Sequence, residues 1–245
     1  MISFGGRCLL LDIEGTTSSV SFVYDKMFPE VRRRLSGFLA DGWEDPEVQE
    51  TCALIARDIG FESSAAWLGT LGPTEAQQCV ASEVIRQMDQ DLKATGLKAL
   101  QGLIWRDSFE RGELRAHLYE DVLPAIRSWV AAGRQVDIYS SGSVAAQRLF
   151  FGHTIHGDLL PMLSYHFDTT IGSKRESDSY RRIASQLGWA PAEILFASDV
   201  VAELDAARVA GLQTVLCQRP GNAAVPLDHQ HAQITSFAQI ELISG

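Results

Sequence analysis

Cysteine is scarce in this sequence, and long apolar runs are missing from it. The 245 residues include four cysteines, and none of them forms a C-x-x-C pair, so neither a disulfide framework nor a zinc ribbon is expected. All four stand at apolar or helix-like positions, which predicts small buried side chains in a reducing compartment: Cys8, Cys52, Cys79 and Cys217. Nowhere do roughly 18 apolar residues follow one another, so no membrane-spanning helix is expected.

Basic residues are also fewer than acidic residues. Lysine and arginine together number 21, against 31 aspartates and glutamates, which gives a formal net charge of −10 at pH 7. An acidic surface disfavours nucleic acid and anionic membranes as partners, although a locally basic site can still bind an anionic small molecule. The first residues lack the basic segment and apolar stretch of a signal peptide. We therefore predict a cytoplasmic monomer that acts on a small molecule.

Four short apolar segments are typical of strands buried on both faces of a sheet: Cys8–Leu11, Val136–Tyr139, Ile194–Ala197 and Thr214–Cys217. Helical patterns separate the later ones. Ser179 is expected to cap a helix that ends at Gly188, and a second helix is expected between Asp199 and Gly211. Alternating strands and helices predict an α/β fold with a doubly wound, Rossmann-like parallel sheet.

The first two predicted strands are about 130 residues apart, whereas a whole βαβ unit needs about 30 residues. The additional segment has helical periodicity. Asp45 and Pro46 are typical of a helix start, and Pro73 opens another helix with Gln77 in the capping-box position. We therefore predict an all-helical cap inserted into the α/β core. The predicted core comprises residues 1–19 and 117–245, and the predicted cap comprises residues 20–116.

Polar residues follow the predicted strands at their carboxyl ends, where open α/β sheets bind ligands. The first strand leads into DIEGTT, the second into YSSGS, and the segment around Phe167 into TTIGSKRES; the strand ending in FAS continues with Asp199. The candidate site residues are Asp12, Glu14, Ser140, Ser141, Lys174 and Asp199. Because these strand ends share one edge of the sheet, we expect the side chains to converge.

This combination suits the hydrolysis of a phosphate ester. Asp12 is a candidate nucleophile that forms an aspartyl-phosphate. A carboxylate that attacks a phosphate dianion meets like-charge repulsion, so a cation is needed, and Mg²⁺ prefers such oxygen ligands. Asp12 and Asp199 are the predicted metal ligands, with the Glu14 backbone carbonyl as a third.

The remaining candidates supply protons and charge. The Glu14 side chain could protonate the leaving oxygen and then activate water. Ser140 or Ser141 and Lys174 would hold the non-bridging phosphate oxygens, where transition-state charge must be neutralised.

Each of these residues also has an ordinary structural interpretation. A D-x-E triplet arises by chance in chains of this length, Ser-Ser-Gly is a common turn, and Asp199 could simply cap a helix. Their occurrence together at one sheet edge favours a common site. No Walker loop or G-x-G-x-x-G pattern is present, so nucleotide binding is not supported.

The order of these segments resembles the haloacid-dehalogenase superfamily of aspartate-nucleophile phosphatases. Most members have Asp two residues after the nucleophile, whereas this chain has Glu14. In having Glu at this position, the chain resembles the enolase-phosphatase branch of methionine salvage. The same resemblance is carried by six segments: the extended DIEGTTSSVSFV, LKALQGLIW, YSSGSVAAQRLFFGHT, FDTTIGSKRESDSYRRIA, FASDVVAELDAA and RPGNA.

The resemblance implies a bifunctional, magnesium-dependent phosphoric monoester hydrolase. Its substrate would be 2,3-diketo-5-methylthiopentyl-1-phosphate, which is first enolised and then hydrolysed to the acireductone 1,2-dihydroxy-3-keto-5-methylthiopentene. Carried over by position, Asp12, Glu14 and Asp199 match the metal site, and Lys174 matches the phosphate-binding lysine. Ser140 and Ser141 match substrate contacts, and Lys98 and Gln101 are cap-side candidates for the other end of the substrate.

Two other interpretations remain open. A general phosphatase of the phosphoglycolate type would keep the fold and change the substrate. A non-catalytic receiver-like module shares the sheet and the acceptor aspartate, but such modules run to only about 120 residues and lack a large cap. For the enolisation, Glu14 is our candidate base, because its additional methylene extends its reach.

Overall fold

The computed structural model describes residues 1–225 and 228–243, and it divides the chain into two compact units. The core unit comprises Met1–Val23 and Arg115–Gly245, and the helical unit comprises Tyr24–Leu114. These borders lie a few residues from those expected at 19/20 and 116/117. A π-helical segment, η1 (Val23–Met27), covers the first border.

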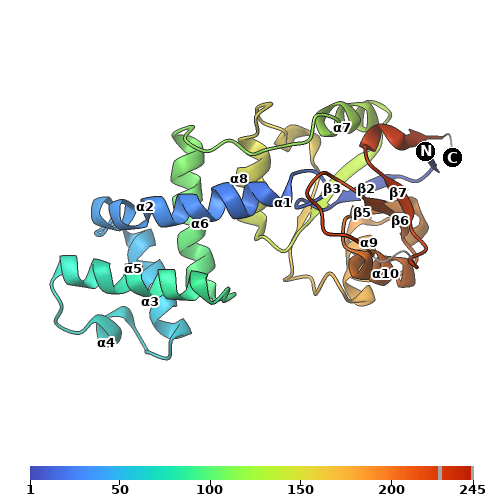
Figure 1. The fold of residues 1–245 in the computed structure, drawn as a ribbon. Coiled ribbons are helices and arrows are strands. Elements are labelled where there is room, and N and C mark those ends of the chain that lie inside the picture. Colours follow the sequence, from blue (N-terminus) through green and yellow to red (C-terminus); the bar gives the residue numbers. More distant parts are fainter. Residues whose placement is uncertain (226–227, 244–245) are drawn as a thin grey trace. The chain divides into compact units, whose positions relative to one another are not determined.

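Within the described residues, the core unit contains a parallel sheet of six strands in the order β4-β3-β2-β5-β6-β7 (Figure 1). Their bounds are β2 Cys8–Leu11, β3 Gln135–Tyr139, β4 His166–Phe167, β5 Ile194–Ser198, β6 Gln213–Cys217 and β7 Ala232–Ile234. The first strand of the site, β2, pairs in parallel with both β3 and β5. The prediction of a doubly wound parallel α/β sheet is confirmed, and each of the four predicted strands is present.

Helices cover both faces of this sheet. Figure 1 shows α7 (Val122–Ala131) on one side and α9 (Ser177–Leu187) with α10 (Val201–Val209) on the other. The other helical elements of the core unit are α1 Val20–Phe22, α8 Val144–Gly152, η2 Leu160–Met162, η3 Pro191–Glu193 and η4 Phe237–Gln239. Two-sided coverage explains why the central strands read as continuous apolar runs.

The start of α9 differs from the prediction. The helix begins at Ser177, after Glu176 as its N-terminal cap residue, so the expected cap at Ser179 is wrong. The Ser179 hydroxyl instead donates a hydrogen bond to the Ser173 carbonyl at 2.7 Å, which fastens the preceding loop. Gly188 does end the helix, in the left-handed conformation that glycine adopts readily.

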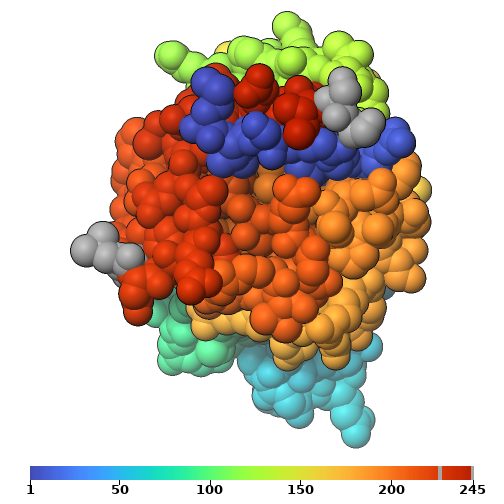
Figure 2. Space-filling model, turned by 90° about the vertical axis from the view of Figure 1, so that its right-hand side faces the viewer, coloured from blue at the N-terminus to red at the C-terminus, as the bar shows by residue number. Residues whose placement is uncertain are grey.

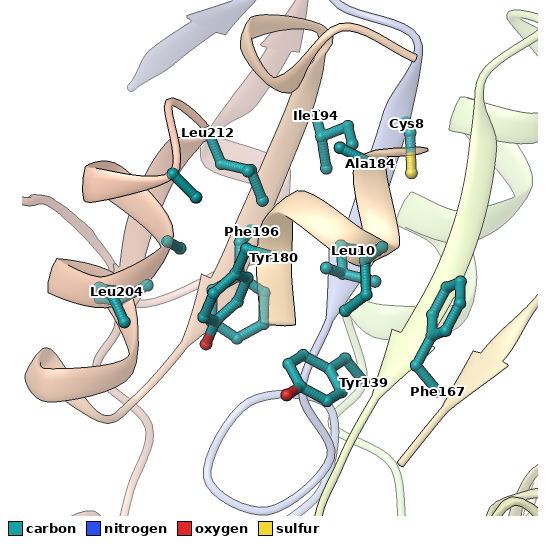
Figure 3. Close-up of a cluster of buried hydrophobic side chains, with 14 of the residues drawn as sticks. Cys8, Leu10, Tyr139, Phe167, Tyr180, Ala184, Ile194, Phe196, Leu204 and Leu212 are labelled. Carbon is teal, nitrogen blue, oxygen red and sulfur yellow. The ribbon is translucent and has the colours of Figure 1, made fainter. Parts of the chain in front are cut away.

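An apolar cluster joins the sheet to α9 and α10 (Figure 3). Leu10, Tyr139, Tyr180 and Phe196 are all fully buried in it. The hydroxyls of both tyrosines lie at the same end of the cluster in Figure 3. Burying a large apolar side chain contributes about 1.5–3 kcal/mol, so this cluster rigidly supports the strands whose ends carry the polar residues.

A second, two-stranded parallel sheet pairs the chain ends and was not predicted. It consists of β1 (Ile2–Phe4) and β8 (Ile240–Leu242). Figure 2 shows the N-terminal residues in blue beside the C-terminal residues in red on this face of the molecule. Three-residue strands with mixed burial carry too little periodicity to be recognised in a sequence.

The helical unit contains α2 Phe28–Asp41, α3 Pro46–Asp58, α4 Ser64–Leu68, α5 Pro73–Asp89 and α6 Thr95–Glu110. The predicted start of α3 is confirmed, because the Asp45 carboxylate accepts from the Glu47 amide at 2.8 Å. In α5 the residue in the capping-box position is Glu75 and not Gln77: its carboxylate accepts from the Gly72 amide at 3.2 Å. The prediction counted the cap from Thr74, whereas the helix already starts at Pro73.

Three of the four cysteines are buried as predicted, but Cys79 is partly exposed, and no disulfide links them. Within residues 1–225 and 228–243, no helix is both long and apolar enough to cross a membrane.

Candidate active site

Asp12 stands directly after β2, at the carboxyl edge of the sheet, and is 4% exposed. One carboxylate oxygen, Oδ1, accepts a hydrogen bond from the Ile13 amide at 2.8 Å. The other, Oδ2, lies 2.7 Å from the Lys174 ammonium. Backbone and lysine therefore hold the carboxylate in one orientation at the end of a central strand.

Lys174 reaches this point from the loop between β4 and α9. Its side chain is 8% exposed, and its ammonium also lies 2.7 Å from Glu203 Oε2. Burial by itself lowers the pKa of this amine, but the adjacent Asp12 and Glu203 carboxylates outweigh it and raise the pKa. Lys174 is therefore a permanently charged cation inside the protein.

Glu203 belongs to the same cluster and was missed in the sequence, whereas Ser198, recognised at the end of its predicted strand, was given no role. The Ser198 hydroxyl is placed to donate to Glu203 Oε2 at 3.0 Å and lies 3.3 Å from Asp12 Oδ2. Burial, followed by the charge of Asp12, raises the pKa of Glu203 to about 7. Glu203 lies in the first turn of α10, and no pattern in the sequence connects it with the site, because Asp199 precedes the helix.

Glu14 and Ser140 are brought together from two strands. The Ser140 hydroxyl is buried and donates to Glu14 Oε2 at 3.3 Å. Burial raises the pKa of Glu14, and the charge of Asp12 raises it further. Ser141 is exposed, and its side chain forms no hydrogen bond to any residue that the structure describes.

Asp199 lies beside Asp12 and Glu14. Burial raises its pKa to about 6, and the charges of those two acids add to the rise. Gly15, at φ +68°, makes room for it, since a Cβ on Gly15 would collide with the Asp199 carboxylate. The alternative that Asp199 caps a helix is wrong, because the N-terminal cap residue of α10 is Val200.

The cluster is suited to a divalent cation. Asp12 and Glu203 contact the Lys174 ammonium, and Glu14 and Asp199 lie near enough to Asp12 to feel its charge, so acidic groups outnumber basic groups in this cluster. No group of three or more His, Cys, Asp or Glu side chains within the described ranges has metal-site geometry. The predicted Mg²⁺ site does not require three such side chains, because its ligands are two carboxylates and a backbone carbonyl. This all-oxygen donor set is the kind that Mg²⁺ prefers.

Buried side chains donate hydrogen bonds to backbone carbonyl groups of the loops around the site. The Tyr180 hydroxyl donates to the Lys174 carbonyl at 2.7 Å, and the Tyr139 hydroxyl donates to the Gly172 carbonyl at 2.9 Å. The Gln147 amide donates to the Gly142 carbonyl at 2.8 Å, next to the two serines. These tyrosines belong to the apolar cluster of Figure 3, so the packed core fixes the lysine loop.

The two cap-side candidates lie in α6 of the helical unit. Lys98 is exposed, whereas Gln101 is 6% exposed, on the packed side of the helix. The structure therefore brings five of the six core candidates together and places Lys98 and Gln101 in the other unit. Ser141, the sixth, is exposed and forms no hydrogen bond to them within the described residues.

Comparison with known proteins gives a consistent result. The sequence-family model of the haloacid dehalogenase-like hydrolases matches residues 7–211. The chain is 46% identical over 241 residues to enolase-phosphatase E1 of Stenotrophomonas maltophilia, covering 96% of this chain and 99% of that protein. It is 49% identical over 224 residues to enolase-phosphatase E1 of Synechococcus elongatus, covering 89% and 91%.

A solved structure agrees over the same length. The UTR4 protein of Saccharomyces cerevisiae superposes with a TM-score of 0.79 at 30% identity, covering 96% of this chain and all of that one. Phosphatases of this hydrolase family generally use Mg²⁺. Sequence, fold and the converging acidic site thus agree: the chain belongs to the enolase-phosphatase E1 family of haloacid dehalogenase-like hydrolases.

Proposed function

We propose that this enolase-phosphatase uses Asp12 as its nucleophile on 2,3-diketo-5-methylthiopentyl-1-phosphate. The observation that carries the assignment is the buried Asp12 carboxylate at the end of β2, held 2.7 Å from Lys174. The family supports the substrate and product, and the geometry supports the proposed residue roles.

Hydrolysis proceeds in two steps. An Asp12 oxygen attacks phosphorus, the bond from phosphorus to the ester oxygen breaks, and an aspartyl-phosphate forms. Glu14 gives a proton to the departing oxygen, and then takes one from the water that releases phosphate from Asp12. Lys174 neutralises charge on the transferring phosphoryl group, and the exposed Ser141 hydroxyl is available to bind its oxygens.

Enolisation requires a base and an electrophile. Burial and the Asp12 charge raise the pKa of Glu14, which suits a carboxyl group that both accepts and donates a proton near neutrality. We assign it as the enolisation base. Glu14 returns the proton that it removes from carbon to the neighbouring carbonyl oxygen, which completes the enol, and it takes a further proton from solvent before it protonates the departing ester oxygen.

The ion Mg²⁺ would be held by Asp12, Asp199 and the Glu14 carbonyl. When bound, it supplies positive charge that offsets the clustered carboxylates and draws the substrate oxygens into the site. Lys98 and Gln101 are proposed to contact the methylthio end of the substrate from the cap, which comprises residues 20–116.

Phosphate release from the diketone phosphate, with Mg²⁺ and after chelation by EDTA, tests this assignment. We expect Mg²⁺-dependent turnover and loss of phosphate release after chelation. A panel of simple phosphate esters distinguishes the alternative: equal turnover of phosphoglycolate would indicate a general phosphatase, and absence of any turnover would indicate a non-catalytic module.

We further propose that the protein works as a cytoplasmic monomer without nucleic-acid or membrane partners. The net charge of −10 supports this, because it opposes binding to polyanions. Light scattering after size-exclusion chromatography tests the oligomeric state, and a mass of twice 26.9 kDa would overturn it.

A further inference from the structure

Asn222 contacts the loop that carries the nucleophile, although it lies in the turn after β6. We call residues 12–17 the nucleophile loop. The Asn222 amide nitrogen donates to the Gly15 carbonyl at 2.9 Å and to the Cys217 carbonyl at 3.1 Å. Next to it, Arg219 Nε donates to the Thr16 carbonyl at 3.0 Å. Two successive carbonyls of the nucleophile loop are thus held by this one turn.

These contacts fix which way the Asn222 amide points. Both protons of Nδ2 face carbonyl oxygens, so the assignment of nitrogen and oxygen follows from the hydrogen bonds. The amide oxygen Oδ1 then faces away from Cys217 and towards Gly15. It is buried and accepts no hydrogen bond from the residues that the structure describes.

The unpartnered oxygen points at the metal-site residues. It lies 3.0 Å from the position that a Cβ on Gly15 would take, and the Asp199 carboxylate reaches into the same space. Leaving a buried acceptor without a donor is unfavourable, so a donor is expected there in the working enzyme. Arg219 donates to the Thr16 carbonyl on the adjacent residue, and the charged group that shares the space with Oδ1 is the Asp199 carboxylate, which attracts a hydrated cation as the donor.

We propose that Asn222 is a positioning residue for the cation of this site. Its amide nitrogen holds the nucleophile loop, which carries Asp12 and the Glu14 carbonyl, and its Oδ1 accepts a hydrogen bond from the hydration shell of the ion beside Asp199. Mg²⁺ usually keeps several waters in proteins, and groups that orient its ligands or waters set its affinity. This inference rests on the proposed Mg²⁺ site.

Calorimetric titration of the substrate-free enzyme with MgCl₂ tests the inference without turnover. We expect Asn222→Ala to weaken Mg²⁺ binding by about 10–100-fold. Gln218→Ala is the matched control, because it removes an exposed amide from the same segment and leaves affinity unchanged. Ile194→Val removes a methyl group from the core, so it controls for a general loss of stability.

The outcomes separate the inference from the proposed function. Unchanged Mg²⁺ affinity in Asn222→Ala overturns the role of Asn222, and so does an equal weakening in Ile194→Val at the same melting temperature. If Asn222→Ala does not fold, Asn222→Ser is titrated instead, because its short hydroxyl side chain cannot replace the amide oxygen. Absence of Mg²⁺ binding by the unmodified enzyme would instead contradict the proposed metal site.

Discussion

Two ion pairs, one in each unit, show opposite uses of charge. In the core unit, the Asp12–Lys174 pair is almost inaccessible, with side chains 5% and 8% exposed. In the helical unit, the Glu47–Arg106 pair is open to water, with side chains 52% and 44% exposed. Exposed pairs contribute about 0–1 kcal/mol, whereas buried charges need partners to be tolerated at all. The Asp12–Lys174 pair is therefore costly to keep and indicates function, whereas the Glu47–Arg106 pair indicates a hydrated surface.

The largest expected effect is at the nucleophile. Asp12→Asn should abolish phosphate release and spare enolisation, because an amide does not attack phosphorus. It should not destabilise the core unit strongly, since it removes one of four crowded carboxylates. Phosphate release measures hydrolysis, diketone absorbance measures enolisation, and thermal unfolding measures stability. Retained phosphate release would reject Asp12 as nucleophile.

Glu14→Ala should slow enolisation by about 10²–10⁴-fold, the usual contribution of a general base. Absorbance of the diketone during a single turnover follows this step separately from phosphate release. A wild-type enolisation rate in this variant would remove Glu14 from the role of base. Glu113→Ala is a suitable control, because it removes an acid of the helical unit that pairs with Arg33 and Arg34 of that unit and with none of the candidate site residues.

Lys174→Met tests the buried pair itself. Loss of the ammonium leaves Asp12 and Glu203 uncompensated, so we expect about 3–5 kcal/mol of destabilisation. Phosphate release should fall by about 10²–10³-fold, as for removal of one charge-stabilising donor. Denaturant unfolding and phosphate release check the two effects. A stability change below 1 kcal/mol, on the scale of an exposed pair, would contradict the contrast between the units.

The smallest effect is expected in the helical unit. Arg106→Ala should change the free energy of unfolding by at most about 1 kcal/mol, and 1 M NaCl should reduce the difference. A double-mutant cycle with Glu47→Ala isolates the pair from other changes. A coupling energy as large as that of the buried pair would show that exposure is a poor guide to the role of charge in this protein.

Much of the fold could be predicted, because burial leaves a pattern in the sequence. The β2 and β5 strands appear as apolar runs, and Asp45 marks the start of α3 through its residue type alone. The predictions failed where the signal was short or shifted by a few residues. The β1–β8 pair is too short to show a period, and Ser179 contacts a loop carbonyl from within α9.

The candidate site could be predicted only in part. Asp12, Lys174 and Asp199 follow strands, so the topology of a parallel sheet brings them to one edge. Glu203 and Asn222 do not follow a strand directly, and only their contacts reveal them. Glu203 has no signal of its own in the sequence, and Asn222 lies in the RPGNA segment, whose resemblance to the family gives it no role.

Periodicity and residue type are local properties of the chain, so they were enough to predict the parallel α/β core, the helical insertion and the order of the acidic segments. The folded structure shows which ionisable groups share one buried space, and therefore which pKa values rise and where Lys174 forms its ion pairs. It also showed that Asn222 holds the nucleophile loop. Electrostatic energies depend on distance and burial, and neither is set by separation along the chain.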